Sequence, residues 1–140
     1  MKTGNNRSGA VFILLGAVFL IAASGLCAWA AEAAPFDVGR LVVCEQVQDR
    51  EPVGISDTFA SETMRVYAFL EARNISADVD VDFVWYHAGS EMSRVTLPVR
   101  QGSRWRTYAG KNLYDLTGTW RVEVQDAAGV VVGAAEFEVE

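Results

Sequence analysis

The chain has 140 residues, which is enough for one domain and too few for two. Its 12 lysines and arginines are outnumbered by 18 aspartates and glutamates, which gives a formal net charge of -6 at pH 7. This acidic balance argues against a nucleic-acid binder, because neutralising phosphates supplies most of the affinity of such proteins.

A hydrophobic segment with a cationic start opens the chain. Before the apolar run from Ala10 to Ala31, only Lys2 and Arg7 are charged. A cationic start, an apolar stretch and then small residues are the order of a secretory signal. We therefore predict a signal peptide or signal anchor with a short linker over residues 1–34, and a folded domain over residues 35–140.

Three fates of this segment stay open. Ala28 and Ala30 form an A-x-A pattern, which favours cleavage after Ala30. The uncharged run is also long enough to span a bilayer, so that an uncleaved chain would be anchored through residues 10–31. A lipid on Cys27 is disfavoured by Leu26, where a lipoprotein signal requires a small residue. Each fate places the folded part in the periplasm or elsewhere in the cell envelope.

Beyond residue 35 the sequence alternates between apolar and polar residues and shows no apolar stripe at helical spacing. A period of two predicts strands with one buried face. The expected inward-facing residues are Val66, Ala68, Leu70 and Ala72; Val79, Val81, Phe83 and Trp85; Val95, Leu97 and Val99; Trp120, Val122 and Val124; Phe137 and Val139. Pro98 lies within one of these runs and marks an edge strand or a bulge.

Turn signals separate the runs and predict about seven strands joined by hairpin-length loops. The expected fold is all-β, an antiparallel β-sandwich of the immunoglobulin or fibronectin type, preceded by an N-terminal hydrophobic helix. Asp115, Gly118 and Trp120 resemble the acid-glycine-aromatic entry to strand F of immunoglobulin-like domains. Trp120 would plug the corner of the sandwich, and Val122 would take the place of the usual disulfide cysteine.

Cys44 is the one cysteine of the predicted domain, which therefore has no internal disulfide. It lies in the strand-like run RLVVCEQV, and we predict a small buried side chain rather than a reactive thiol. A domain of about 110 residues can bury a core without a cross-link.

A basic block interrupts the acidic background between residues 92 and 121, where six lysines and arginines accompany a single acid. The candidate residues for a ligand or partner face are Arg94, Arg100, Arg104, Trp105, Arg106, Tyr108 and Lys111. Alternation directs Trp105 to one side of its strand and Arg104, Arg106 and Tyr108 to the other.

Two interpretations of this block stay open. In the first, Trp105 enters the core, and the arginines pair across strands with the acidic stripe of Asp78, Asp80 and Asp82. In the second, Trp105 or Tyr108 stacks on a sugar ring or aromatic group while the arginines bind a carboxylate or phosphate. The second interpretation requires an exposed Trp105.

Little in the sequence points to catalysis. His87 is the only histidine and lies at a strand end beside AGSE, with Ser90 and Glu91 near it in sequence. Nothing like a nucleophile elbow surrounds these residues, so we expect an exposed loop histidine and not a catalytic one. The acidic stripe departs from a calcium loop, with Phe83 in the place of the required glycine and Gly89 in that of the bidentate glutamate. We expect no enzyme, no catalytic residue, no metal and no cofactor.

Five blocks of sequence together resemble a known family. They are REPVG (50–54), RVYAFLEARN (65–74), FVWYHAG (83–89), RWRTYAGKNL (104–113) and GTWRVEVQDAAGVVV (118–132). On these blocks the chain from Cys44 to Glu140 resembles a bacterial domain of unknown function, the family numbered 2914. The resemblance implies an extracytoplasmic sandwich, often behind a membrane segment, with no established activity, so no catalytic residue is transferred.

These observations lead to an expected function. We predict a non-enzymatic module of the cell envelope that mediates protein–protein interaction or assembly. The alternative is a module that binds carbohydrate or cell wall through an aromatic-basic face. The expected partners are an envelope protein, a cell-wall glycan under the alternative, and the membrane if residues 10–31 are retained; no nucleic acid is expected.

Overall fold

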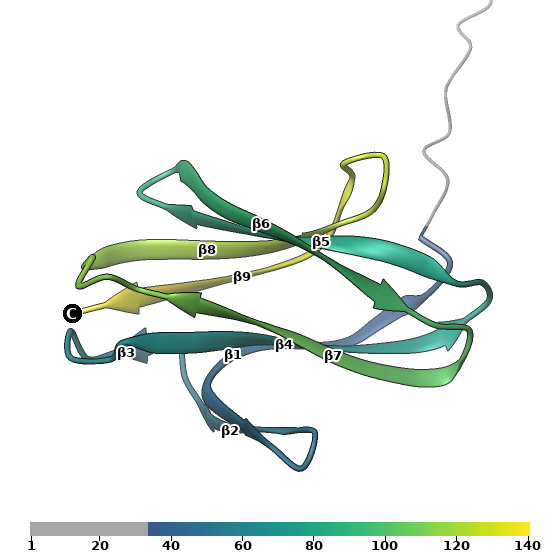
Figure 1. The fold of residues 1–140 in the computed structure, drawn as a ribbon, viewed down its shortest axis with the longest axis horizontal. Helices are drawn as coiled ribbons and strands as arrows, with labels where there is room; N and C mark the ends of the chain where they lie inside the picture. The colour runs from purple at the N-terminus through teal and green to yellow at the C-terminus, as the bar shows by residue number, and fades with distance from the viewer. Residues whose placement is uncertain (1–33) are drawn as a thin grey trace, which may run out of the picture. The chain divides into compact units, whose positions relative to one another are not determined.

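The computed structural model describes residues 34–140, which form nine β-strands. The strands are β1 (Asp37–Gln48), β2 (Glu51–Ile55), β3 (Thr58–Phe59), β4 (Arg65–Ile75), β5 (Val79–His87), β6 (Ser90–Val99), β7 (Gly102–Asn112), β8 (Gly118–Gln125) and β9 (Val131–Val139). They form two sheets that pack face to face (Figure 1). The predicted all-β sandwich is confirmed.

Several predictions concern residues outside this range. The signal peptide or anchor, the cleavage site after Ala30 and the N-terminal hydrophobic helix all lie outside the described residues. Within residues 34–140, no helix has the length and apolar character needed to cross a membrane.

The two sheets differ in size and in their edges. The four-stranded sheet has the order β2-β1-β4-β7, and the five-stranded sheet has the order β3-β9-β8-β5-β6. Neighbouring strands are antiparallel except for β3 and β9, which run parallel. Pro98 lies on β6, which is an edge strand as the proline predicted. The prediction of about seven strands misses β2 and β3. These strands have five and two residues, which are too few to show alternation.

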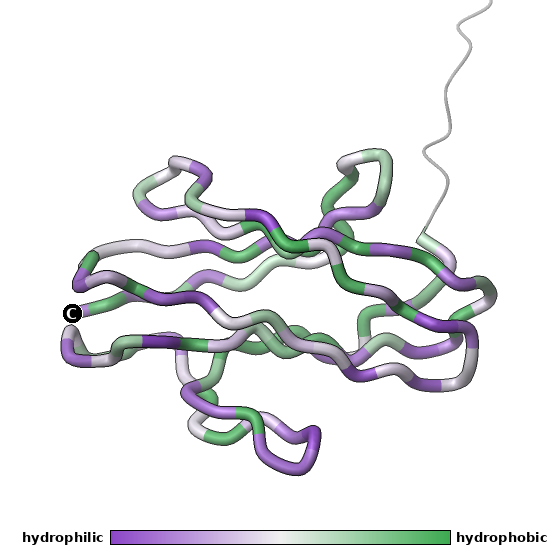
Figure 2. Tube along the Cα trace, viewed as in Figure 1, coloured by the Kyte–Doolittle hydropathy of each residue, from purple (hydrophilic) through white to green (hydrophobic). Residues whose placement is uncertain are grey.

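The core lies between the sheets, and alternation predicted most of it. Every predicted inward residue of β4, β8 and β9 is buried, and on β5 only Val79 stays partly exposed. On β6, Val99 is buried, Leu97 packs partly against the core and Val95 is 40% exposed. The alternation is visible along the strands as a change between hydrophilic and hydrophobic residues (Figure 2).

A tryptophan closes one corner of the sandwich where the chain enters β8. Trp120 is fully buried, and its indole Nε1 donates a hydrogen bond to the carbonyl oxygen of Leu116 at 2.9 Å. Its ring stacks on Phe137 with centroids 6.1 Å apart. His87 ends β5, and its Nε2 is 2.7 Å from the carbonyl oxygen of Thr117. The predicted corner role of Trp120 is confirmed. His87 lies at the predicted strand end, but its side chain is half-buried and not exposed.

The β1–β2 hairpin projects from the four-stranded sheet (Figure 1). Its turn residues Asp49 and Arg50 have φ values of 50° and 61°, as a type I′ turn requires. Cys44 pairs with β2 on one side and with β4 on the other, so its side chain is fully buried, as predicted. Burial raises the pKa of the Cys44 thiol.

Candidate partner face

β7 directs its basic residues to the outside of the four-stranded sheet. It pairs with β4 so that Arg106 lies opposite Glu71 and Tyr108 lies opposite Phe69. These four residues lie on the outer face, because the alternate residues of β4 form the core. Trp105 occupies the other register, where it is partly buried and packs against the core. The alternation predicted for this strand is confirmed.

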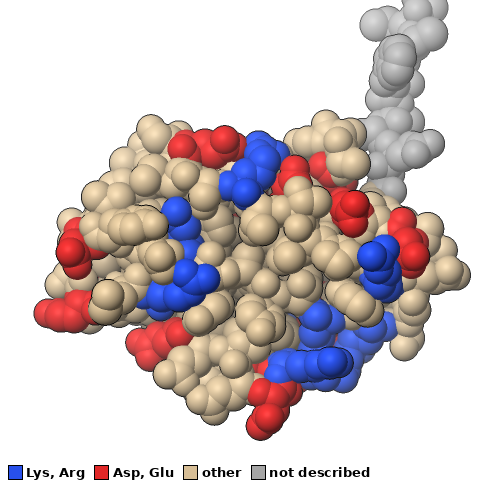
Figure 3. Space-filling view, viewed as in Figure 1, with Lys and Arg blue, Asp and Glu red and all other residues tan. Residues whose placement is uncertain are grey.

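Arginines from three strands gather around two glutamates on this outer face, and Arg50 of the β1–β2 turn lines a groove together with two of them. We call the following seven residues the basic face: Arg40, Arg50, Arg73, Arg104, Arg106, Glu51 and Glu71. The space-filling view shows lysine and arginine side chains gathered on its lower right side, near β7 and the β1–β2 hairpin (Figure 3).

Glu71 is the buried centre of the basic face, with a side chain that is only 9% exposed. Its carboxylate lies 2.7 Å from the guanidinium of Arg73, 3.7 Å from that of Arg40 and 3.8 Å from that of Arg104. A carboxylate this far from water requires such partners, since an unpaired buried charge is strongly destabilising. Glu71 therefore fixes three guanidinium groups close together.

Glu51, on the β1–β2 hairpin, is the second acid of the basic face. Arg40 donates a hydrogen bond to it at 3.0 Å, and Arg106 pairs with its other carboxylate oxygen. The hydrogen bond from Arg40, followed by the charge of Arg106, holds the pKa of Glu51 below its usual value. Four arginines thus share two carboxylates, which leaves two positive charges uncompensated before Arg50 is added.

A groove of about 440 Å³ lies on the basic face, lined by Arg50, Phe69, Arg104, Trp105, Arg106 and Tyr108. Phe69 is fully buried although it points away from the core, and the guanidinium of Arg40 lies 5.2 Å from its ring centroid. Tyr108 is 48% exposed at the rim of the groove. The groove therefore combines an aromatic floor with guanidinium groups.

The structure divides the seven predicted face residues between two sheets. Arg104, Trp105, Arg106 and Tyr108 line the groove together. Lys111 also lies on β7, but its ammonium is 5.6 Å from the ring centroid of Tyr114 rather than at the groove.

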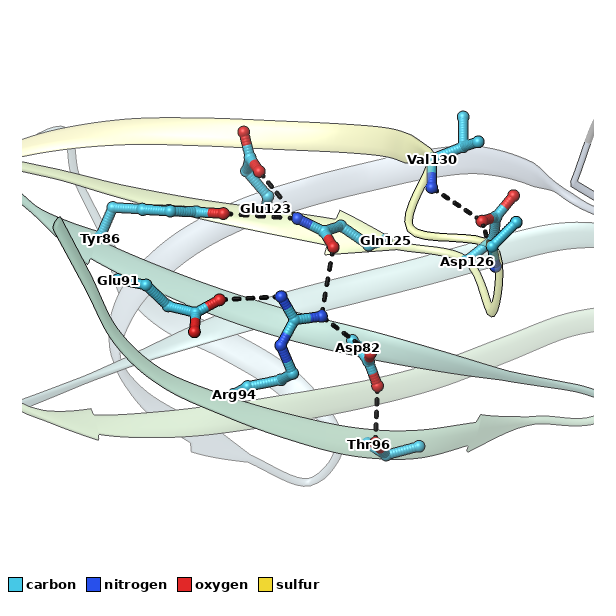
Figure 4. A network of polar contacts seen from close by, with 10 residues as sticks. Asp82, Tyr86, Glu91, Arg94, Thr96, Glu123, Gln125, Asp126 and Val130 are labelled. Atoms are coloured by element: carbon cyan, nitrogen blue, oxygen red, sulfur yellow. Dashed lines mark hydrogen bonds and ion pairs between the residues drawn. The ribbon is translucent and has the colours of Figure 1, made fainter. Parts of the chain in front are cut away.

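Arg94 and Arg100 belong to the other sheet and not to the basic face. Arg94 pairs with Asp82 at 3.1 Å and with Glu91 at 2.8 Å (Figure 4). Arg100 lies 3.8 Å from Asp78. The Arg94–Asp82 pair joins β6 to β5, and Arg100 and Asp78 flank the same two strands, as the first interpretation of the basic block predicted. Glu91 lies on β6 together with Arg94. One block of sequence thus supplies structural ion pairs on one sheet and the groove on the other.

Asp82 accepts hydrogen bonds from two side chains in that network (Figure 4). The hydroxyl of Thr96 donates to it at 2.6 Å, and Arg94 donates to it at 3.1 Å. The hydrogen bond from Thr96 and then that from Arg94 hold the pKa of Asp82 below its usual value despite partial desolvation. Arg94 also reaches Gln125 on β8, which links three strands of the five-stranded sheet.

Sequence reasoning missed the residues that complete the basic face. Arg40, Arg50, Arg73, Glu51 and Glu71 come from β1, β4 and the hairpin, far from the basic block in sequence. Glu71 had one sequence signal, because it is an acid in the middle of the apolar run of β4. Its partners become evident only when β1 and β7 are placed on either side of β4.

Catalytic groups are sparse in the described part of the chain. Over residues 34–140, no three histidine, cysteine, aspartate or glutamate side chains gather as a metal site would require. The ring of His87 lies 4.8 Å from that of Trp120, so it forms part of the sandwich corner. The guanidinium groups of the basic face are suited to binding an anionic group.

Comparison with known proteins gives one family. The family model "Protein of unknown function (DUF2914)" matches residues 78–139, which span β5 to β9. The predicted family is thereby confirmed, although the likeness was expected to begin at Cys44 and the match leaves out β1 to β4. No curated protein matches the sequence.

Similar solved structures come from much larger proteins. A β-glucosidase from Kluyveromyces marxianus has 12% identity and a TM-score of 0.45, over 75% of this chain and 14% of that chain. A mutant β-glucosidase from Listeria innocua in complex with laminaribiose has 11% identity and a TM-score of 0.48, over 75% of this chain and 16% of that chain. Likenesses at this level carry no argument about function.

Proposed function

We propose that this chain, whose residues 78–139 match the DUF2914 family of proteins of unknown function, is a non-enzymatic module of the cell envelope that binds a protein partner through the basic face. One observation carries the proposal. Four arginines share only Glu51 and Glu71, and Arg50 lies beside them at an open groove. An acidic chain that concentrates cations in one place is suited to an anionic surface.

The strand order supports a sandwich of the immunoglobulin or fibronectin type. In such domains two antiparallel sheets pack together and an aromatic residue near the start of strand F bonds back to the backbone. Here β1-β4-β7 faces β9-β8-β5-β6, and Trp120 bonds to Leu116 at the start of β8. Domains of this architecture commonly serve at cell surfaces.

Export to the periplasm or cell envelope is part of the proposal. The cationic start and the apolar run from Ala10 to Ala31 support it, with cleavage near Ala30 or retention as a single-pass anchor. The mass of the protein isolated from cells separates these fates. A protein that begins at residue 31 and is released by osmotic shock has been cleaved, whereas the full mass in the membrane fraction identifies an anchor.

A glycan partner is the second candidate, and Tyr108 is the observation that favours it. Its ring is 48% exposed beside arginines, where it could stack on a sugar while a guanidinium binds a carboxylate. The glycan interpretation also requires an exposed Trp105, but the ring of Trp105 packs partly against the core. The partial burial of Trp105 weighs in favour of a protein partner.

Photo-cross-linking in intact cells tests the proposal. A benzophenone amino acid replaces Tyr108 on the basic face or, as a matched control, Val95, which is 40% exposed on β6 of the other sheet. We expect a discrete protein adduct from position 108 alone, and its loss when Arg104→Glu and Arg106→Glu are combined. Adducts from both positions, or only glycan fragments at position 108, would contradict a protein partner at this face.

A further inference from the structure

Four of the strands of residues 34–140 end a sheet, and β7 is the longest of these and has no proline. It has 11 residues and lies at the end of the four-stranded sheet, where β4 is its sheet neighbour. The other edges are shorter or carry a proline: β2 has five residues and Pro52, β3 has two, and β6 has Pro98. Short strands and prolines are ordinary ways to protect an edge from strand addition.

One hydrogen bond at the end of the β4–β7 pairing shows which residues of β7 direct their backbone groups to β4 and which direct them to the free edge. The amide of Leu113 donates to the carbonyl oxygen of Met64 at 2.9 Å, and the β4–β7 register continues from there without a bulge. In an antiparallel ladder every second residue pair exchanges hydrogen bonds. The residues at 105, 107, 109 and 111 therefore bond to β4, and the N–H and C=O groups of Arg104, Arg106 and Tyr108 point to the free edge.

The residues with edge-facing backbone groups also line the groove on the basic face with their side chains. Arg104, Arg106 and Tyr108 line the 440 Å³ groove. A second groove of about 430 Å³ borders Tyr108 from the other end of β7, lined by Glu45, Gln46, Val47, Arg65, Tyr67 and Tyr108. A strand added to an edge gains affinity from main-chain hydrogen bonds and specificity from pockets for its alternate side chains.

We propose that β7 receives an extended acidic polypeptide segment as an additional strand, an inference that rests on the proposed function and specifies its binding mode. Side chains of the added strand that share the outer face lie beside Arg104 and Arg106, where opposite charges stabilise the pairing. A second copy of β7 would place arginines against arginines and is disfavoured for the same reason. Charge thus selects an acidic partner segment over self-association.

The test uses the full-length protein, purified in neutral detergent, and a fluorescent peptide of about ten residues that alternates glutamate with valine. Its counterpart with lysine in place of glutamate is the control probe. Fluorescence anisotropy measures affinity, and NMR hydrogen exchange measures protection of the Arg104 and Arg106 amides. We expect the acidic peptide alone to bind and to slow exchange at both amides.

Position 108 separates the backbone contribution from the side-chain contribution. Tyr108→Pro and Tyr108→Ala both remove the phenol, but only the proline also removes an N–H that faces the edge and not β4. We expect Tyr108→Pro to bind the acidic peptide about tenfold more weakly than Tyr108→Ala, which corresponds to about 1.4 kcal/mol.

Each other outcome overturns the inference in a recognisable way. Binding that is lost in Arg104→Glu/Arg106→Glu but is equal in the two Tyr108 variants, without amide protection, overturns strand addition and leaves the basic face as a partner site. If the acidic peptide does not bind although position 108 cross-links to a protein in cells, strand addition is likewise overturned and the basic face remains a partner site. Peptide-independent dimers in size-exclusion chromatography, with Arg104 and Arg106 amides protected, would show that the edge serves a second copy instead.

Discussion

The contribution of the Trp120 hydrogen bond to stability can be measured by comparison with Trp85, a second buried tryptophan of the same core. Trp120 is fully buried and donates to Leu116, whereas Trp85 is 1% exposed and its Nε1 has no hydrogen-bond partner. Both rings pack edge-on or stacked against Phe137. Trp120→Phe and Trp85→Phe therefore remove the same atoms from similar surroundings, but only the first breaks a hydrogen bond.

The difference between the two variants isolates that bond. A lost hydrogen bond costs about 0.5–1.5 kcal/mol, and a buried acceptor left without a donor raises the cost to about 1–3 kcal/mol. We expect Trp120→Phe to lower the free energy of unfolding by about 1–3 kcal/mol more than Trp85→Phe, measured by urea denaturation at equal m-values. Equal losses in the two variants would refute the reasoning that the corner bond stabilises the entry to β8.

Three further predictions concern single sites. Trp105→Ala should lower the free energy of unfolding by about 2 kcal/mol in urea denaturation, less than the 3–5 kcal/mol typical of a buried tryptophan, because the ring is only partly buried; an unchanged midpoint would contradict its packing on the core. Ala88→Asn should stabilise the protein by about 0.5–1 kcal/mol, because Ala88 has a φ of 48° in the β5–β6 turn; a lower thermal midpoint would contradict this. Asp82 has a lowered pKa, so its ionised carboxylate stabilises the folded protein above about pH 4, and this stabilisation is lost as the pH falls through the folded-state pKa. Thr96→Val removes the hydrogen bond that contributes most to the lowered pKa, so its urea midpoint should fall less steeply with decreasing pH than that of the wild type.

Alternation predicted the core because each long strand has one face against the other sheet. It could not predict the residues that are buried on the outer faces. Phe69 and Val84 point away from the core, yet both are fully buried. Phe69 is covered by the guanidinium of Arg40 from another strand. Such burial depends on long side chains from distant segments, which leave no periodic signal in sequence.

The sequence predicts one surface for the seven candidate face residues, but only four of them line the groove. The topology explains the difference, because the chain passes from one sheet to the other between Val99 and Gly102. Arg94 precedes this crossing, Arg100 lies at its start beside Asp78, and Arg104 and Arg106 follow it, so the two pairs lie on different sheets. Closeness in sequence does not imply a shared surface where a strand connection changes sheets.

The burial of Cys44 makes its thiol a probe of local opening in the domain. Its thiol is inaccessible between β2 and β4, and its raised pKa makes the nucleophilic thiolate rarer still. In a chain whose Cys27 is replaced by serine, a thiol reagent can label the domain only while β1 has separated from a neighbouring strand. The labelling rate therefore reports how often β1 separates from β2 or from β4. Separation from β2 opens the hairpin that carries Glu51 and Arg50.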